Sequence, residues 1–336
     1  TTTTSLPIIA GPLSLPDQVS LTLIDLTEFW TEELPAVFGM AYEPVTVLGG
    51  YDVDVDGPPP CGDEVLEPAI ARGNAFYCPV DDSVAWDEVE LFPTLYDDFG
   101  PFAVSLVLAH EWGHAVQSRV LESGLPTIVS ELQADCYAGA WTGHAIDGGL
   151  VDVGATELDV ATAGFLYFRD PVSGSATDAG AHGNAFDRVG AFTDGIRDGV
   201  ESCAGYADEF PPITQIGFRS AEDAASGGNL PKADVVPQLA KTLDVWWATV
   251  LEASGVAWDA FSQAATLEPS GESPCTVIDP ASLGSGFGYC QGEDALVLDF
   301  DGVLDPLYDA FGDFGPAFVM GNAWAEKGQS LLGLET

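Results

Sequence analysis

Basic residues are scarce in this chain of 336 residues. It has 9 Lys and Arg against 53 Asp and Glu, which gives a formal net charge of −44 and a pI near 4.1. A protein this acidic repels polyanions, so nucleic acids and anionic lipid surfaces are excluded as partners. Two explanations of the acidity stay open: a saline habitat, where salt screens the self-repulsion, or the ordinary acidity of an exported protein.

The sequence also lacks the features of a membrane span and of a cysteine-rich zinc site. No apolar run reaches about eighteen residues, so no segment is predicted to cross a membrane. Residues 1–7, TTTTSLP, have neither an initiating Met nor a basic stretch, which we interpret as a chain whose signal peptide has been removed. The six cysteines form no CxxC pair, which favours disulfides. We therefore expect a secreted or otherwise extracytoplasmic protein.

Histidine is the next scarce residue, and its distribution is informative. The chain has only 4 histidines, and two of them lie four residues apart in LVLAHEWGHAVQS, residues 106–118. The segment contains no proline after Pro101 and is rich in apolar residues, which predicts a helix. Positions four apart share one helix face, so His110 and His114 can bind one metal ion, and Glu111 can reach a water on that metal. This is the HExxH motif of zinc peptidases.

A second predicted helix supplies a third ligand. The stretch TIVSELQADCYAGAWTGHA, residues 127–145, places Glu131 and Asp135 four apart on one face. Glu131 completes a set of two histidines and one glutamate, and Asp135 is placed to accept the outward N–H of His110 and fix its tautomer. On its own the pair is typical of a solvated acidic face, but beside HExxH the ligand role is favoured. We leave His144, later on the same helix, out of the site.

These motifs together resemble a known family. HEWGHAVQ, ELQADCYAGAW and AHGNAFDRVGAFTDGIRDG occur in the order found in the neutral zinc metallopeptidases of bacteria, a gluzincin-like group, and the resemblance covers roughly residues 19–206. It implies an α+β fold, with a zincin-like catalytic domain built from an active-site helix and a small sheet. It also implies one zinc ion bound by His110, His114 and Glu131, with Glu111 as the general base.

Two further roles follow from resemblance: that of His182 from the His-Gly that the bacterial family carries in this loop, and that of the NAFY segment from thermolysin-like enzymes. The segment NAFY at residues 74–77 is similar to the edge strand that aligns substrate in those enzymes, so Asn74 and Ala75 are candidate substrate-binding residues. An ordinary strand after a turn is the alternative for Asn74. His182, in the GAHGN loop, is a candidate catalytic residue that donates to the oxyanion of the tetrahedral intermediate.

The function expected from these residues is peptide hydrolysis by a secreted zinc metalloendopeptidase. A zinc-bound water attacks the peptide carbonyl, and Glu111 takes its proton and passes it to the leaving amine. The partner is then a peptide or protein substrate. The alternative is an exported pseudo-peptidase or binding protein with a structural or absent metal. Three protein ligands and a water favour the enzyme, whereas a closed site with four protein ligands favours the alternative.

The C-terminal part of the sequence repeats the N-terminal part. GYCQGEDALVLDFDGVLDPLYDAFGDF, from residue 288, aligns without gaps on FYCPVDDSVAWDEVELFPTLYDDFGPF, from residue 76, at a constant offset of 290 − 78 = 212. We interpret residues 233–336 as a degenerate repeat of residues 17–121, which leaves residues 17–232 as the metallopeptidase domain. Chance similarity between two amphipathic helices is the alternative.

In the second copy the metal ligands are replaced. Asn322, Ala323 and Glu326 stand where the first copy has His110, Glu111 and His114, so no metal is expected there, and Glu326 is expected to be exposed or bonded to a basic residue. The duplication also assigns the disulfides. Two of them close equivalent loops in the two copies and the third joins the remaining cysteines, giving Cys61–Cys78, Cys275–Cys290 and Cys136–Cys203.

A weaker motif lies in DVDVDG, residues 52–57. Asp52, Asp54 and Asp56 imitate the first half of a calcium-binding loop, but three prolines at residues 58–60 rule out the exiting helix of an EF-hand. A plain acidic loop is the default expectation, and a structural Ca²⁺ bound by these three residues is the alternative.

Overall fold

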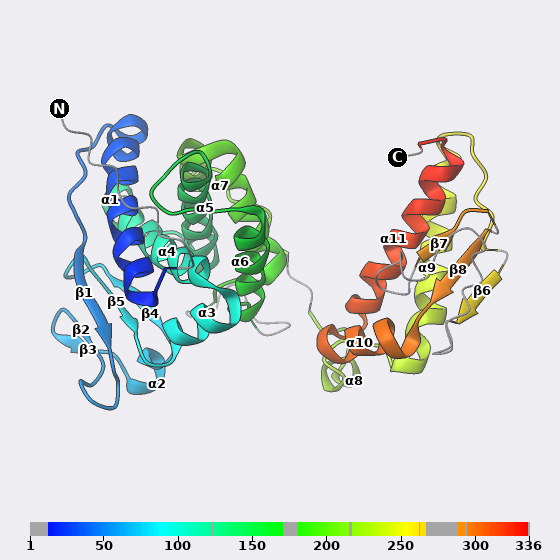
Figure 1. Cartoon of the computed structure of the whole chain (residues 1–336), viewed down its shortest axis with the longest axis horizontal. Helices are drawn as coiled ribbons and strands as arrows, with labels where there is room; N and C mark the ends of the chain where they lie inside the picture. The colour runs from blue at the N-terminus through cyan, green and yellow to red at the C-terminus, as the bar shows by residue number, and fades with distance from the viewer. Residues whose placement is uncertain are drawn as a thin grey trace. The chain divides into compact units, whose positions relative to one another are not determined.

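The computed structural model describes residues 13–121, 124–170, 181–214, 217–261, 263–266, 288–292 and 294–334. Its contacts divide the chain into two compact units, Thr1–Gly217 and Phe218–Thr336, which are coloured blue to green and green to red in Figure 1. The fold is α+β, rich in helix and with small sheets. The domain boundary expected at residues 232/233 stays a prediction. No helix among the described residues is long and apolar enough to cross a membrane.

The first unit begins with helix α1 (Leu15–Phe38), which packs against the helix that carries HExxH. Ser14 caps its first turn by accepting the N–H of Asp17, and Gly39 ends it in the left-handed region with φ 68°. The side chains of Leu26, Trp30 and others are buried in the main core. Helix α1 thus covers one side of the site-bearing helices.

A three-stranded sheet packs beside the helix that carries HExxH (Figure 1). The strand order is β1 (Thr46–Tyr51), β5 (Ser83–Asp87), β4 (Ala75–Cys78); β1 runs parallel and β4 antiparallel to β5. Strand β5 is buried along its whole length, as expected for the central strand. Strand β4 is therefore an edge strand, and the Cys61–Cys78 disulfide links its end to β2 (Pro60–Cys61), which pairs with β3 (Glu64–Val65).

Three long helices form the core behind the site. They are α4 (Pro101–Val120), α5 (Thr127–Ile146) and α7 (Ala185–Gly205). Helices α5 and α7 approach so closely that a Cβ added at Gly139 would meet the Phe192 carbonyl, and one added at Gly195 would meet the Cys136 carbonyl. The remaining helices of this unit are α2 (Pro68–Ala71), α3 (Leu91–Phe99) and α6 (Ala155–Tyr167).

The Cys136–Cys203 disulfide joins α5 to the end of α7. With Cys61–Cys78, it gives two of the three pairs expected from the sequence. The third expected pair, Cys275–Cys290, involves Cys275, which lies outside the described residues. Disulfides of this kind form in oxidising compartments, which is consistent with an extracytoplasmic protein.

The second unit contains a sheet of the same topology. Its strand order is β6 (Gln263–Thr266), β8 (Ala295–Leu298), β7 (Gly288–Cys290), with β6 parallel and β7 antiparallel to β8. The register also agrees at an offset of 212, since Tyr289 pairs with Leu296 as Tyr77 pairs with Val84. The helical elements of this unit are α8 (Ala221–Ala225), α9 (Lys232–Glu252), the π-helix η2 (Phe300–Leu304), α10 (Asp305–Phe311) and α11 (Phe314–Leu331).

Each unit also contains its own copy of certain side-chain contacts. Asp82 and Asp294 are the non-glycine residues with positive φ among the described residues, and each accepts the hydroxyl proton of a strand tyrosine, Tyr77 and Tyr289 respectively. On α11, Trp324 is buried like Trp112 on α4. Glu326 is exposed, as expected, and accepts the Tyr289 backbone N–H at 3.3 Å.

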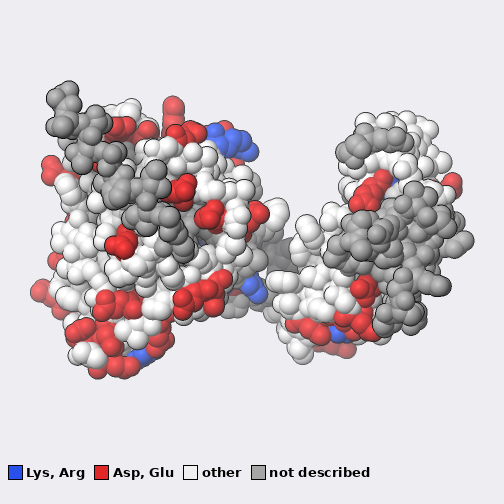
Figure 2. Space-filling model, viewed as in Figure 1, with Lys and Arg blue, Asp and Glu red and all other residues white. Residues whose placement is uncertain are grey.

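Acidic side chains are spread over the visible face of both units, whereas Lys and Arg are few (Figure 2). Several of the basic residues make ion pairs, among them Arg72 with Asp54 and Lys327 with Asp294. Lys327 is buried, so its pairing also compensates a charge that would be costly to leave alone in the core of the second unit.

Candidate metal centre

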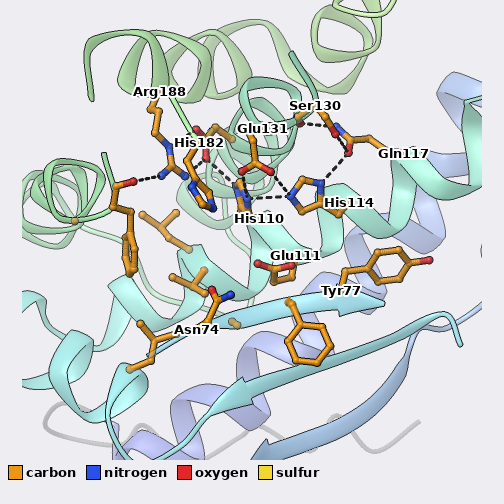
Figure 3. A pocket seen from close by; sticks show the side chains of 18 of the residues that line it. Asn74, Tyr77, His110, Glu111, His114, Gln117, Ser130, Glu131, His182 and Arg188 are labelled. Carbon is orange, nitrogen blue, oxygen red and sulfur yellow. Dashed lines mark hydrogen bonds and ion pairs between the residues drawn. The ribbon is translucent and has the colours of Figure 1, made fainter. Parts of the chain in front are cut away.

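Helix α4 presents two imidazoles toward Glu131 of the following helix and one carboxylate toward strand β4. His110 and His114 lie one turn apart, with ring centroids 4.7 Å apart and Nε2 atoms 3.1 Å apart. Glu111 points from the same helix toward β4 (Figure 3). Pro101 begins the helix at a position where its missing N–H costs no hydrogen bond. Most of the apolar residues of the helix are buried.

Helix α5 brings a third group to the same point. The Glu131 carboxylate lies 3.3 Å from Nε2 of His110 and 3.4 Å from Nε2 of His114. One ligand atom from each of these residues lies within 4.8 Å of the other two, and this is the group of potential metal ligands found among the described residues. The structure thus brings together the three residues predicted from HExxH and the second helix.

Asp135 contacts His110 directly, and Arg188 in turn contacts Asp135. Its Nδ1 lies 2.8 Å from Oδ1 of Asp135, which is fully buried. Arg188, on α7, donates two hydrogen bonds to the same carboxylate, from Nε to Oδ2 at 2.7 Å and from Nη2 to Oδ1 at 2.8 Å. Burial alone would raise the pKa of Asp135, but Arg188 and His110 lower it, so Asp135 is ionised. An ionised Asp135 accepts the proton on Nδ1 and leaves Nε2 of His110 facing Glu131.

The electrostatics of the cluster favour a positive charge at its centre. Burial lowers the pKa of His110, but Asp135 and Glu131 outweigh it and raise that pKa to about 10. Burial also lowers the pKa of His114, and Glu131 raises it above its usual value. Oε2 of Glu131 is buried and accepts no hydrogen bond. Two nitrogens and a carboxylate that converge and attract a cation fit a zinc ion, which prefers this mixture of ligands.

Glu111 lies beside the cluster without joining it. Its side chain is buried, and desolvation raises its pKa, although the two ligand histidines oppose the shift. The backbone N–H of Tyr77 on β4 also donates to it. A buried carboxyl with a raised pKa is suited to take a proton and return it near neutral pH.

A cavity of about 740 Å³ opens between these groups and strand β4. Asn74 and Ala75 line it, and Asn74 directs its side chain into it (Figure 3). Most of the remaining wall is apolar, and includes Leu95, Leu106 and Phe168. The cavity is within the size range of ligand pockets in proteins.

His182 also lines the cavity, but its imidazole is half exposed. The backbone N–H groups of His182 and Gly183 donate to Asp170 at 3.0 Å and 2.7 Å, which fixes the loop that carries the imidazole. His110 and Arg188 line the same cavity, so the three side chains border one space. This position is compatible with contact to a substrate, and the assigned donor role stays a prediction.

Comparison with known proteins agrees with the geometry. Residues 17–206, more than half of the chain, match the family described as "Putative neutral zinc metallopeptidase". This chain belongs to that family. The YpfJ protein of Escherichia coli is 32% identical in an alignment of 151 residues that covers 37% of this chain and 50% of that protein. A Mycobacterium tuberculosis protein is 39% identical in an alignment of 92 residues that covers 23% of this chain and 31% of that protein.

These two relatives are uncharacterized proteins. The chain covers between 31% and 50% of their length, so the resemblance is to a part of each. No solved structure matches the chain. The family membership therefore points to zinc and to peptidase chemistry, and the roles of single residues are argued from the geometry of the site.

One expectation from the sequence and one residue that it missed need comment. The calcium alternative at Asp52, Asp54 and Asp56 is unsupported, because Arg72 donates to both oxygens of Asp54, at 2.7 Å and 3.2 Å, and so occupies that carboxylate. The sequence reasoning also overlooked Gln117, whose Oε1 lies 2.9 Å from Nδ1 of His114. Its signal was a polar residue three positions after a ligand, on the same helix face.

Proposed function

We propose that this protein is a zinc-dependent metallopeptidase that hydrolyses peptide bonds, with His110, His114 and Glu131 as the metal ligands. The observation that carries the proposal is the convergence of three ligand atoms within 4.8 Å beside a buried glutamate, at the wall of a cavity. Zinc supplies a Lewis acid that lowers the pKa of water and polarises a carbonyl. Three protein ligands leave a position open for that chemistry, as in catalytic rather than structural zinc sites.

The remaining steps belong to residues of the chain. Glu111 takes the proton of the attacking water and returns it to the leaving amine, and its raised pKa suits both transfers. Asp135, held by Arg188, keeps His110 in the tautomer with its proton on Nδ1. His182 lines the cavity and is assigned the donor to the developing oxyanion.

Strand β4 supports an extended substrate. The N–H of Asp87 donates to the carbonyl of Asn74, so Asn74 is a hydrogen-bonded position of the β4–β5 ladder. Because these positions alternate in antiparallel pairs, the backbone groups of Ala75 and Tyr77 point away from β5. The Tyr77 N–H meets Glu111, which leaves Ala75 to pair with a peptide added along the edge, with Asn74 beside it.

We assign the second unit no catalytic role of its own. The shared strand order, register and tyrosine contacts support the interpretation of residues 233–336 as a degenerate repeat of residues 17–121. It would then be a structural partner of a catalytic domain at residues 17–232. The disulfides support export, so we propose an extracytoplasmic location.

The test of the function is Glu111→Gln. The amide keeps the size of the side chain but accepts no proton, so the variant should keep zinc and lose hydrolysis of casein and of short peptides by about 100-fold or more. Glu326→Gln, an exposed change on α11, is the matched control and should alter neither. Hydrolysis by Glu111→Gln at the parental rate would contradict the mechanism, and a parental protein without zinc would contradict the function.

A further inference from the structure

Gln117 is the one polar contact of His114 that the mechanism above does not use. It is buried on α4, three residues after the ligand. Its Oε1 lies 2.9 Å from Nδ1 of His114 and accepts the hydroxyl proton of Ser130 at 2.8 Å. Its Nε2 donates to the Ser130 carbonyl at 2.6 Å and to Oε1 of Gln133 at 3.1 Å. All four polar contacts of the amide are therefore made inside the protein, and Figure 3 shows those with His114 and Ser130.

Two main-chain carbonyls determine which way this amide faces. The Cys203 carbonyl can only accept, so Gln133, which lies 2.9 Å from it, must direct its Nε2 there and its Oε1 toward Gln117. The Ser130 carbonyl can also only accept, so it receives Nε2 of Gln117. Both constraints place Oε1 of Gln117 against His114. Since an amide oxygen accepts only, Nδ1 of His114 must carry the hydrogen, and Nε2 is free for the metal.

From these contacts we infer that Gln117 is a positioning residue for the second metal ligand, and that its amide fixes the tautomer and ring direction of His114. The inference rests on the proposed metal site. The two histidines are thus held by chemically different groups: His110 by a carboxylate paired with Arg188, and His114 by a neutral amide. The amide adds no charge to a cluster that already contains Glu131 and Glu111.

A carboxylate would fail at this position for a reason visible in the contacts. In Gln117→Glu, an oxygen would replace Nε2 and face two acceptors, the Ser130 carbonyl and Oε1 of Gln133. The carbonyl has no hydrogen to donate, and Gln133 cannot offer a donor there while its Nε2 stays on the Cys203 carbonyl. Gln117→Met is the cleaner change, because it keeps the length of the side chain and removes both the acceptor for His114 and the donors.

The first measurement is zinc affinity by competition with a chromophoric chelator. We expect Gln117→Met to bind zinc about 10- to 100-fold more weakly than the parental protein, as is typical when a group that orients a ligand is lost. Gln329→Met is the matched control: Gln329 aligns with Gln117 at the offset of 212 but is exposed on α11, so its zinc affinity should equal the parental one. Equal affinity of Gln117→Met and the parental protein would overturn the inference.

The second measurement separates positioning from general damage. In the zinc-loaded parental protein, imidazole ¹H–¹⁵N spectra should show hydrogens on Nδ1 of both His110 and His114, each protected from exchange with water. Gln117→Met should lose protection at His114 alone, because His110 keeps Asp135. Loss at both histidines, or at neither, would overturn the inference. If the variant does not fold, the parental spectrum still decides, since an unprotected Nδ1 hydrogen on His114 contradicts it. A parental protein that binds no zinc would instead refute the proposed function.

Discussion

Replacing Arg188 tests the polar core behind the site. Asp135 has no exposed surface, and two of the hydrogen bonds on its carboxylate come from Arg188. In Arg188→Met, Oδ1 keeps the N–H of His110, whereas Oδ2 loses the donor that the structure gives it. Breaking a buried ion pair from one side typically costs about 3 to 5 kcal/mol. Because one partner stays, we expect a loss near 3 kcal/mol in the free energy of unfolding of the first unit.

The assay is calorimetry, with the first unit identified by the rise of its melting temperature when zinc is added. For a unit of this size, about 1 kcal/mol corresponds to roughly 2 to 4 °C, so the expected fall is about 6 to 12 °C. The comparison is made in metal-free protein so that altered zinc affinity does not enter. Arg197→Met is the control, since Arg197 lies on the same helix and is also ion-paired, but its side chain is 64% exposed. Its loss should leave the melting temperature of the first unit nearly unchanged, because an exposed ion pair contributes little.

A double-mutant cycle with Asp135→Asn completes the test. The asparagine removes the buried charge, so Arg188→Met should cost much less in the Asp135→Asn background than in the parental protein. Costs that add, or an Arg188→Met variant as stable as Arg197→Met, would refute the claim that the Arg188–Asp135 pair compensates a buried charge behind His110.

Three further outcomes are expected. Glu131→Ala should abolish most zinc binding, whereas Asp135→Ala should weaken it about 10- to 100-fold, and equal, negligible effects in metal analysis would contradict the ligand assignment. Burial would raise the pKa of Asp87, but the backbone N–H groups that it accepts lower its pKa below the unfolded value. The stabilisation that the Asp87 carboxylate provides is therefore present above about pH 4 and is lost as the pH falls through the folded pKa. In urea unfolding, the stability of Asp87→Asn should differ from that of the parental protein at pH 7 and converge toward it in acid, and a difference that stays constant with pH would refute this. Gly195→Ala should destabilise the first unit by about 1 to 3 kcal/mol or more, because the new Cβ meets the backbone of α5, while Gly190→Ala on the same helix has open space and should be neutral or slightly stabilising in the same melts.

Much of the site was predictable from the sequence because its signals are local. His110, Glu111 and His114 lie within one helical turn, and helical periodicity alone places them on neighbouring faces. Glu131 and Asp135 needed one further step, the assumption that two successive helices approach one metal. Within each helix the spacing of these residues places them on one face, and such spacing is the property that a sequence predicts best.

The features that the sequence did not predict depend on contacts between elements that are far apart in the chain. Gln117 matters because the carbonyl of Cys203, at the end of α7, orients Gln133 and through it the amide. Gly139 and Gly195 matter because two helices touch there. A glutamine or glycine on a helix carries no local sign of such a neighbour, so neither role could be predicted without the packing. The ion pair that leaves the calcium alternative without support is equally non-local, since Arg72 lies 18 residues from Asp54 in the chain.

The division of the proposed metal ligands between α4 and α5 would link metal binding to the folding of this unit. Neither helix offers three ligands, so high affinity exists only while the two helices are packed against each other. Whatever free energy the metal contributes on binding is then a free energy that holds this helix pair together. The ion would accordingly be taken up late in folding, and its rate of loss to a chelator would report how often the pair opens.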